Sequence, residues 1–127
     1  MNHHKKRILV VDDEPSITRL LKLNLEQTDD YEVMVENIPN KALRVAHEFQ
    51  PDLILLDVLM PGMDGGELAS HVRASPRLGK VPIVFLSAAA TKAEVSAHHG
   101  VVGGLPFLAK PVDMPEVIAS LRRYIAS

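Results

Sequence analysis

The strongest constraint on the fold of this chain is a run of four aliphatic residues, Leu53 to Leu56, that ends in a single carboxylate, Asp57. Consecutive aliphatic residues are typical of a strand that is buried on both faces, as in the middle of a parallel sheet. Asp57 then falls where this strand leaves the core. Because open α/β sheets bind ligands at the carboxyl ends of their strands, the position of Asp57 indicates a functional residue.

Three other apolar runs also end in polar residues. They are Arg7 to Val11 before Asp12 and Asp13, Val81 to Leu86 before Ser87, and Leu105 to Ala109 before Lys110. If all these strands are parallel, their carboxyl ends meet at one edge of the sheet. We therefore expect these polar side chains to lie near Asp57.

Helix signals separate the strands. Pro15 suits a first helical position, Asn37 to Pro39 begins a second helix, and Asp113 is predicted to be the N-cap of the last helix. A short fourth helix is predicted from Ala88 to His99. Apolar residues at helical spacing indicate the buried faces of the other helices. They are Ile17, Leu20, Leu21 and Leu25 in the first, Ala42, Val45, Ala46 and Phe49 in the second, Leu68 and Val72 in a third from about Gly66 to Ala74, and Met114, Val117, Ile118, Leu121, Tyr124 and Ile125 in the last.

With the alternating segment Tyr31 to Val35, the sequence predicts five strands that alternate with five helices. This is the pattern of an α/β fold with a parallel sheet covered by helices on both faces. Right-handed crossovers favour a single doubly wound sheet with strand order 2-1-3-4-5. The direction of winding then changes between the first and third strands, which brings Asp12, Asp13 and Asp57 to the same crevice.

The length of 127 residues fits one domain over residues 1–127, with a frayed N-terminus over about residues 1–6. The sequence has no cysteine, a formal net charge of −2 and no long apolar run. We therefore expect a cytoplasmic protein with no disulfides and no membrane attachment. The absence of a basic stripe argues against direct nucleic-acid binding by this domain.

The three aspartates at the crevice indicate a metal site. Clustered carboxylates repel one another unless a cation joins them, and oxygen ligands favour Mg²⁺, which commonly bridges carboxylates to a phosphate. Lys110 would add positive charge, and Ser87 a hydrogen bond, to a tetrahedral anion. An ionised aspartate can accept a phosphoryl group covalently. We assign that role to Asp57, because Asp12 and Asp13 form a pair suited to holding the metal.

Each signal also has a plainer explanation when it is taken alone. Asp12 and Asp13 could be an acidic pair at a helix N-terminus, and Lys110 could be a solvated loop lysine. Ser87 by itself indicates almost nothing, and Phe107 could be an ordinary core residue. The joint appearance of polar residues at four strand ends favours a functional site.

In these motifs the chain resembles the receiver domains of two-component response regulators. The resemblance covers essentially the whole length, through Ile8 to Pro15, Asp57 to Gly65, Leu86 to Ala88 and Lys110 to Pro111. It implies the flavodoxin-like receiver fold and a phosphorylation switch. Asp57 would take a phosphoryl group from the phosphohistidine of a sensor histidine kinase or a phosphotransfer protein. By this resemblance, Mg²⁺ would be held by Asp12, Asp13, Asp57 and the backbone carbonyl of Leu59.

The resemblance also implies roles for the remaining site residues. Ser87 matches the switch hydroxyl that moves toward the phosphoryl group, Phe107 the switch aromatic that turns inward, and Lys110 the lysine that pairs with phosphoryl oxygens. The family usually has a cis bond at the position of Lys110-Pro111. The fourth helix, fifth strand and fifth helix would form the output face, through which receivers meet partners or form homodimers. Such a module catalyses its own phosphorylation and dephosphorylation but is not otherwise an enzyme.

The sequence departs from the family pattern in two places. Val101 to Pro106 replaces a plainer run of small residues before the last strand. Leu59 and Ala89 are apolar where faster members of the family carry polar side chains that help to place the attacking water. We therefore expect slow self-dephosphorylation.

Other functions remain open. A phosphorylation-independent docking module would leave the clustered carboxylates without a use. A phosphatase with an aspartyl-phosphate intermediate typically has a second aspartate two residues after the nucleophile, where this sequence has Leu59. A nucleotide binder is disfavoured because no glycine-rich loop follows the first strand. The sequence names neither the cognate kinase nor the output, and we favour a single-domain regulator over the receiver of a longer protein.

Overall fold

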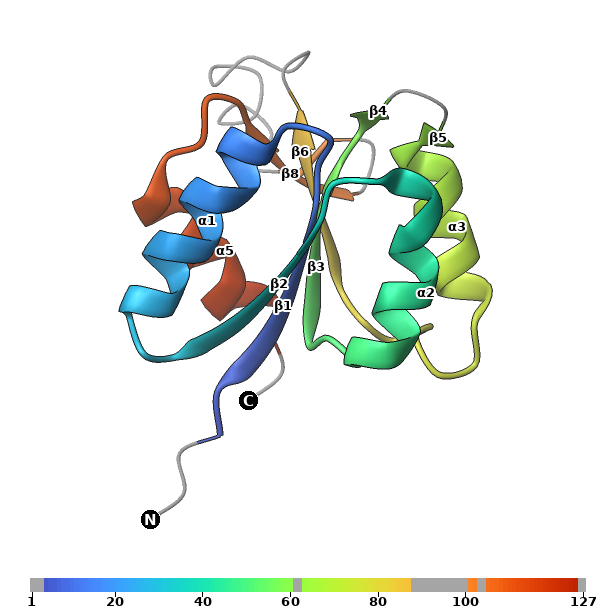
Figure 1. Ribbon diagram of the computed structural model, residues 1–127, viewed down its shortest axis with the longest axis horizontal. Coiled ribbons are helices and arrows are strands. Elements are labelled where there is room, and N and C mark those ends of the chain that lie inside the picture. The colour runs from blue at the N-terminus through green and yellow to red at the C-terminus, as the bar shows by residue number, and fades with distance from the viewer. Residues whose placement is uncertain (1–3, 61–62, 88–100, 103–104, 126–127) are drawn as a thin grey trace.

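The computed structural model describes residues 4–60, 63–87, 101–102 and 105–125. Strands and helices alternate along most of the chain (Figure 1). In chain order they are β1 (Lys6–Val11), α1 (Pro15–Gln27), β2 (Tyr31–Glu36), α2 (Pro39–Phe49), β3 (Leu53–Asp57), β4 (Leu59–Met60), β5 (Met63–Asp64), α3 (Gly65–Ala74), β6 (Ile83–Ser87), β7 (Val101–Val102), β8 (Leu105–Ala109) and α5 (Met114–Tyr124).

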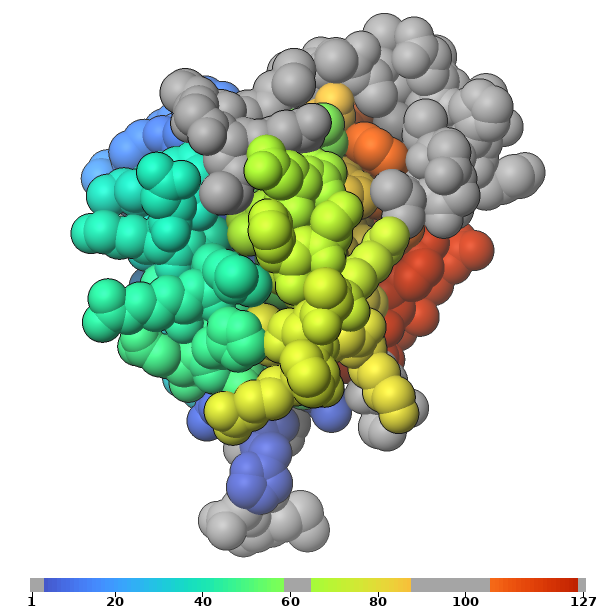
Figure 2. Space-filling view, turned by 90° about the vertical axis from the view of Figure 1, so that its right-hand side faces the viewer, coloured from blue at the N-terminus to red at the C-terminus, as the bar shows by residue number. Residues whose placement is uncertain are grey.

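Five parallel strands form the main sheet in the order β2-β1-β3-β6-β8. These are the five predicted strands in the predicted order 2-1-3-4-5, so the flavodoxin-like α/β fold is confirmed. Helices α1 and α5 cover one face of the sheet and α2 and α3 cover the other (Figure 1). Figure 2 shows the second face, where α2 and α3 lie side by side.

The core consists of two apolar layers, one on each face of the sheet. Successive residues of β3 alternate between them: Ile54 and Leu56 pack toward α2 and α3, whereas Leu53 and Leu55 pack toward α1 and α5. All four are buried. The prediction of a central strand buried on both faces is therefore confirmed, and it explains why this strand contains no polar residue before Asp57.

The helix faces agree with the prediction except in α1. Its buried residues are Thr18, Leu21 and Leu25, whereas Leu20, which was predicted to be buried, is 44% exposed. At 3.6 residues per turn, Leu20 lies about 100° around the helix from Leu21 and farther from Thr18 and Leu25, outside the buried stripe. The predicted buried residues of α2, α3 and α5 all lie in the two apolar layers or pack against them.

Some details of the elements differ from the sequence analysis. β6 begins at Ile83 rather than Val81. Asp113 stands at the N-cap of α5, as predicted, but its side chain makes no capping hydrogen bond. Pro115 follows two residues later and lacks one of the N–H groups that such a cap usually binds. The predicted helix from Ala88 to His99 lies outside the described residues.

Two short pairings were not predicted. β7 adds an antiparallel strand beside β8, so the sheet has six strands rather than five. β4 and β5 form a two-stranded antiparallel pair directly after β3. Strands of two residues show no alternation in a sequence, which is why the prediction missed them. None of the described helices is long and apolar enough to cross a membrane.

Candidate functional site

Three aspartates meet at the carboxyl edge of the sheet. Asp57 ends β3, and Asp12 and Asp13 follow β1, its neighbour in the sheet. Each offers a carboxylate oxygen, and the three oxygens lie within 4.8 Å of one another. Asp12 is completely buried and Asp57 is 4% exposed. The structure thus brings together the three aspartates that the topology predicted to share a crevice.

Lys110, which follows β8, reaches these carboxylates across the end of β6. Its Nζ lies 2.8 Å from Oδ2 of Asp12 and 3.5 Å from Oδ2 of Asp57, and its side chain is 8% exposed. Nζ is also 3.3 Å from Oε1 of Glu14. The backbone N–H of Lys110 donates to the carbonyl of Ser87 at 2.9 Å. The Lys110-Pro111 bond is cis, as the family resemblance implied.

The charge of Lys110 follows from its surroundings. Burial alone lowers the pKa of its amine, but the carboxylates of Asp12, Asp57 and Glu14 outweigh burial and raise the pKa above its ordinary value. Lys110 therefore carries a positive charge at neutral pH. One amine facing three clustered aspartates still leaves an excess of negative charge.

The donor set at this edge fits a hard divalent cation. Oδ1 of Asp12 accepts a hydrogen bond from the backbone N–H of Glu14 at 3.0 Å. Oδ2 of Asp12 is buried and has an ion pair with Lys110 but no aligned hydrogen-bond donor among the described residues. A buried carboxylate oxygen in this situation is unfavourable unless a further positive group compensates it. Carboxylate oxygens are the ligands that Mg²⁺ prefers, so a divalent cation would complete the site.

The segment after Asp57 is fixed by a close backbone approach. The N–H of Gly65 donates to the carbonyl of Val58 at 2.8 Å. A Cβ at position 65 would overlap the carbonyl oxygen of Asp57 and the main chain of Val58. Only glycine can occupy this position without displacing the end of β3. Leu59, whose carbonyl was predicted to be a metal ligand, directly follows Val58 and is the first residue of β4.

The two predicted switch residues lie on adjacent strands. Ser87 is the last residue of β6 and is 5% exposed. It follows Leu86, which is in register with Asp57. Phe107 in β8 is in register with Phe85. The two rings stack with centroids 5.1 Å apart. Ser87 is therefore beside the aspartate cluster, whereas Phe107 is partly buried against the α2 and α3 layer.

A response regulator receiver domain model matches residues 8–122. The chain is a response regulator receiver domain. Among its curated relatives, this receiver is 34% identical over 118 residues to the DNA-binding dual master transcriptional regulator RpaA of Synechocystis, covering 91% of this chain and 47% of the relative. It is 34% identical over 123 residues to the DNA-binding response regulator MtrA of Mycolicibacterium smegmatis, covering 96% of this chain and 51% of the relative. The receiver thus spans about half the length of these curated relatives.

Solved receiver structures share the same fold. The chemotaxis protein CheY4 of Vibrio cholerae matches with a TM-score of 0.80 and 30% identity, covering 96% of this chain and 100% of that chain. The receiver domain of the sensor histidine kinase PA1611 of Pseudomonas aeruginosa matches with a TM-score of 0.80 and 28% identity. The match covers 98% of this chain and 100% of that chain. That structure has a magnesium ion coordinated in the active-site cleft.

Two polar residues near the site were missed by the sequence analysis. Glu14 pairs with Lys110, although the sequence analysis gave it no role in the site. Asn37 was treated as part of the start of the second helix, but its side chain donates to the backbone of Asp12. A signal existed in both cases. Glu14 directly follows two predicted site residues, and Asn37 directly follows a strand that neighbours β1.

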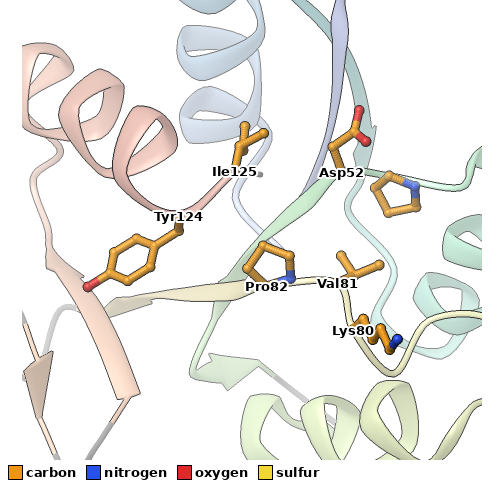
Figure 3. Close-up of a pocket in the computed structure, with 7 residues that line it drawn as sticks. Asp52, Lys80, Val81, Pro82, Tyr124 and Ile125 are labelled. Atoms are coloured by element: carbon orange, nitrogen blue, oxygen red, sulfur yellow. The ribbon is translucent and has the colours of Figure 1, made fainter. Parts of the chain in front are cut away.

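A separate hollow lies at the opposite edge of the sheet (Figure 3). It has a volume of about 320 Å³ and is lined by residues that precede β3 and β6 or that end α5. These are Pro51, Asp52, Lys80, Val81, Pro82, Tyr124 and Ile125. Because they lie at the amino ends of the strands, this hollow is not part of the aspartate cluster.

Proposed function

We propose that this receiver is a phosphorylation switch in which Asp57 accepts a phosphoryl group from a sensor histidine kinase or a phosphotransfer protein. The observation that supports this most strongly is the convergence of Asp57 with two further aspartates and a buried lysine at the carboxyl edge of the sheet. Phosphoryl transfer depends mainly on positioning and on neutralising charge. This site offers both, together with a carboxylate nucleophile.

In the proposed transfer, a carboxylate oxygen of Asp57 attacks the phosphorus of the donor phosphohistidine. A phosphorus–oxygen bond forms while the phosphorus–nitrogen bond breaks, and the electron pair of the broken bond stays on the donor imidazole. Lys110, which faces Asp57 at 3.5 Å, would pair with the phosphoryl oxygens. The hydroxyl of Ser87 would donate a hydrogen bond to them.

The residues proposed to hold Mg²⁺ are Asp12, Asp13, Asp57 and the backbone carbonyl of Leu59. When bound, the ion would neutralise charge on the phosphoryl oxygens during transfer. The buried Oδ2 of Asp12, which lacks an aligned hydrogen-bond donor, is consistent with this assignment. A magnesium ion in the cleft of the PA1611 receiver supports the same choice of metal.

Phosphorylation of Asp57 would add negative charge and acceptor oxygens beside Ser87. This charge would shift a neighbouring segment from one of two conformations to the other. We propose that Ser87 and Phe107 transmit this change to the predicted output face, of which β8 and α5 belong to the described residues, and that partners or a second receiver would bind there. The named relatives are DNA-binding proteins of about twice this length. We assign no nucleic-acid contact, and no membrane contact, to the receiver itself, and we expect it to act in the cytoplasm.

The test is to incubate the protein with Mg²⁺ and a small acyl phosphate and then to measure its intact mass. We expect one added phosphoryl group, which should be absent from Asp57→Asn and from samples with a chelator. Asp29→Asn is a matched control, because Asp29 lies in an exposed turn at the far end of α1. No added mass on a protein that binds Mg²⁺ would instead favour a docking module that works without phosphorylation.

A further inference from the structure

The main chain of Asp12 is hydrogen-bonded on both sides to the end of β2. Its N–H donates to the carbonyl of Glu36 at 3.2 Å. Its carbonyl accepts a hydrogen bond from Nδ2 of Asn37 at 2.8 Å. Asp12 is completely buried, and a buried backbone carbonyl without a donor is unfavourable. The side chain of Asn37 therefore supplies a partner that the sheet itself does not provide.

The second hydrogen of the Asn37 amide is also used. Nδ2 donates to Oγ1 of Thr18 at 3.0 Å, and Oγ1 of Thr18 donates to the carbonyl of Pro15 at 3.1 Å. Thr18 is 2% exposed. Because a backbone carbonyl can only accept, the atom that faces Asp12 must be the amide nitrogen, which settles the orientation of the side chain. Asn37 thus links the end of β1 to the first turn of α1.

This link acts on the peptide that carries the acidic pair. The carbonyl bound by Asn37 belongs to the peptide group between Asp12 and Asp13. Because the peptide group is planar, fixing its carbonyl holds the two Cα atoms that it joins. With the N–H of Asp12 also held by Glu36, the backbone rotations that would turn the two side chains apart are restricted. Repulsion between Asp12, Asp13 and Asp57 would otherwise favour a turn in which the carboxylates separate.

We propose that Asn37 is a positioning residue for the metal site, acting through the Asp12–Asp13 peptide and supported by Thr18. It contacts neither the predicted ligand oxygens nor the phosphoryl group. Its role is to keep the carboxylates of Asp12 and Asp13 converged on Asp57 against their mutual repulsion. This inference rests on the proposed function, because it assigns Mg²⁺ to that cluster.

The experiment is calorimetric titration of the whole protein with MgCl₂. Asn37→Ala removes both hydrogen bonds of the amide. We expect the dissociation constant for Mg²⁺ to rise roughly tenfold, because removal of a group that orients a metal ligand weakens metal binding by at least about this factor. Thr18→Val keeps the shape of the side chain but removes the hydroxyl, and it should weaken binding less, in the same direction. Thr18→Ser restores the hydroxyl and should restore the affinity.

Thr28→Val is the matched control. Its hydroxyl donates to the carbonyl of Leu25 at 2.7 Å and accepts from the N–H of Asp30 at 3.2 Å, at the other end of α1. We expect its Mg²⁺ affinity to equal that of the wild type. Urea unfolding of each variant separates an effect on affinity from a general loss of stability.

Unchanged affinity in Asn37→Ala would overturn the inference, as would an equal loss in Thr28→Val. If Asn37→Ala does not fold, the Thr18 series decides, and equal affinities for its valine and serine variants would reject the role. A wild-type protein that binds Mg²⁺ but gains no phosphoryl group would contradict the proposed function alone. In that case the measured affinities still test Asn37.

Discussion

Lys110 shows how one buried charge sets the chemistry of the site. Its amine faces Asp12, Asp57 and Glu14 within 3.5 Å, and its raised pKa keeps it protonated at neutral pH. A cation would approach the same carboxylates, so Lys110 and Mg²⁺ repel each other across the cluster. Lys110 should therefore assist transfer of the phosphoryl group without assisting metal binding.

Replacement of Lys110 separates these two effects. In Lys110→Met we expect phosphorylation by a small acyl phosphate to slow roughly a hundredfold, as on removal of one preorganised donor to developing negative charge. The Mg²⁺ affinity should be equal or higher, because a competing positive charge is gone. Phosphorylation rates from intact mass and titration with MgCl₂ check both expectations. A weaker affinity for Mg²⁺ would show that Lys110 organises the metal site instead.

Gly65 gives a prediction about the backbone beside Asp57. A methyl group at this position would overlap the main chain at the end of β3, so Gly65→Ala should lower the free energy of unfolding by about 1–3 kcal/mol. Gly66→Ala, one residue further into α3 and exposed, is the control. It should leave stability unchanged or raise it, because alanine favours a helix. Urea unfolding measures the stability of both variants. Equal free energies of unfolding for Gly65→Ala and Gly66→Ala would refute the close approach at Gly65.

The apolar residues at positions 59 and 89 predict a long-lived phosphorylated state. Neither Leu59 nor Ala89 can hydrogen-bond a water molecule through its side chain. After removal of the phosphoryl donor, we expect the phosphorylated mass to persist for many minutes, and Leu59→Asn to shorten its lifetime. Decay of the wild-type phosphorylated form within seconds would contradict this prediction.

At the scale of residues, the sequence predicted those candidate site residues that lie at the ends of strands. Asp12, Asp13, Asp57 and Lys110 each end or follow an apolar run, and parallel topology brings such ends together. The same rule would have placed Asn37 near the site, because it directly follows β2, but not its proposed role, which depends on the distance between its amide and a carbonyl after β1. A one-dimensional pattern contains no such distance.

At the scale of elements, side chains of α1 rather than another strand bind the main chain of Val33 at the open edge of β2. The N–H of Val33 donates to Oε2 of Glu26 at 3.1 Å, and the carbonyl of Val33 accepts from Nζ of Lys22 at 2.7 Å. Lys22 and Glu26 also pair with each other at 3.2 Å. These two residues of α1 occupy positions that a neighbouring strand would use, which protects the edge against pairing with other chains.

This pair predicts a pH-dependent contribution to stability. Burial alone raises the pKa of Glu26, but the hydrogen bond from Val33 and the charge of Lys22 outweigh it, so the pKa lies below its ordinary value of 4.5. A lowered pKa in the folded state means that the stabilisation is present above that ordinary value and is lost as the pH falls through the folded-state pKa. The stability difference between wild type and Glu26→Gln should therefore be largest near neutral pH.

Urea unfolding at pH 7 and at successively lower pH measures this difference. We expect it to shrink and then vanish in acid, where Glu26 becomes neutral in both folded and unfolded chains. Arg44→Gln is a control for surface pairs, because the exposed Arg44–Glu48 ion pair has no backbone partner in the contacts described. A difference that does not change with pH would show that the carboxylate charge of Glu26 is not what stabilises the edge.

Long elements were predictable from the sequence and short ones were not. The five parallel strands and the described helices carry enough apolar residues to show a period, and their order followed from the handedness of crossovers. The two-residue strands β4, β5 and β7 have no period and depend on their partners for definition. The prediction that Leu20 is buried was wrong for a related reason. The apolar character of residues alone does not give the width of the buried face of a helix.

At the scale of the whole molecule, the proposed metal site and the fold are linked through the end of β1 and the end of β3. A ligand that binds only the folded state stabilises it according to its concentration. Mg²⁺ at about one hundred times its dissociation constant should therefore raise the free energy of unfolding by about 2.7 kcal/mol. A chelator should remove this increase.

Asp13→Asn tests whether this increase comes from the aspartate cluster. The variant removes one of the three converging carboxylates, so the increase at the same Mg²⁺ concentration should become smaller. Thermal or urea unfolding with and without MgCl₂ provides the measurement. An increase of equal size in the variant would place the stabilising ion elsewhere on the molecule.

The first strand begins and the last helix ends at the edge of the sheet opposite to the aspartates (Figure 1). Tyr124 at the end of α5 lines the same hollow as Pro51, which precedes β3. The five residues of β3 then separate this edge from Asp57 by about 17 Å. A fluorescent protein or an immobilisation tag joined before β1 or after α5 would therefore stand away from Asp57, the proposed phosphoryl acceptor, which makes this receiver suited to surface-based and single-molecule assays.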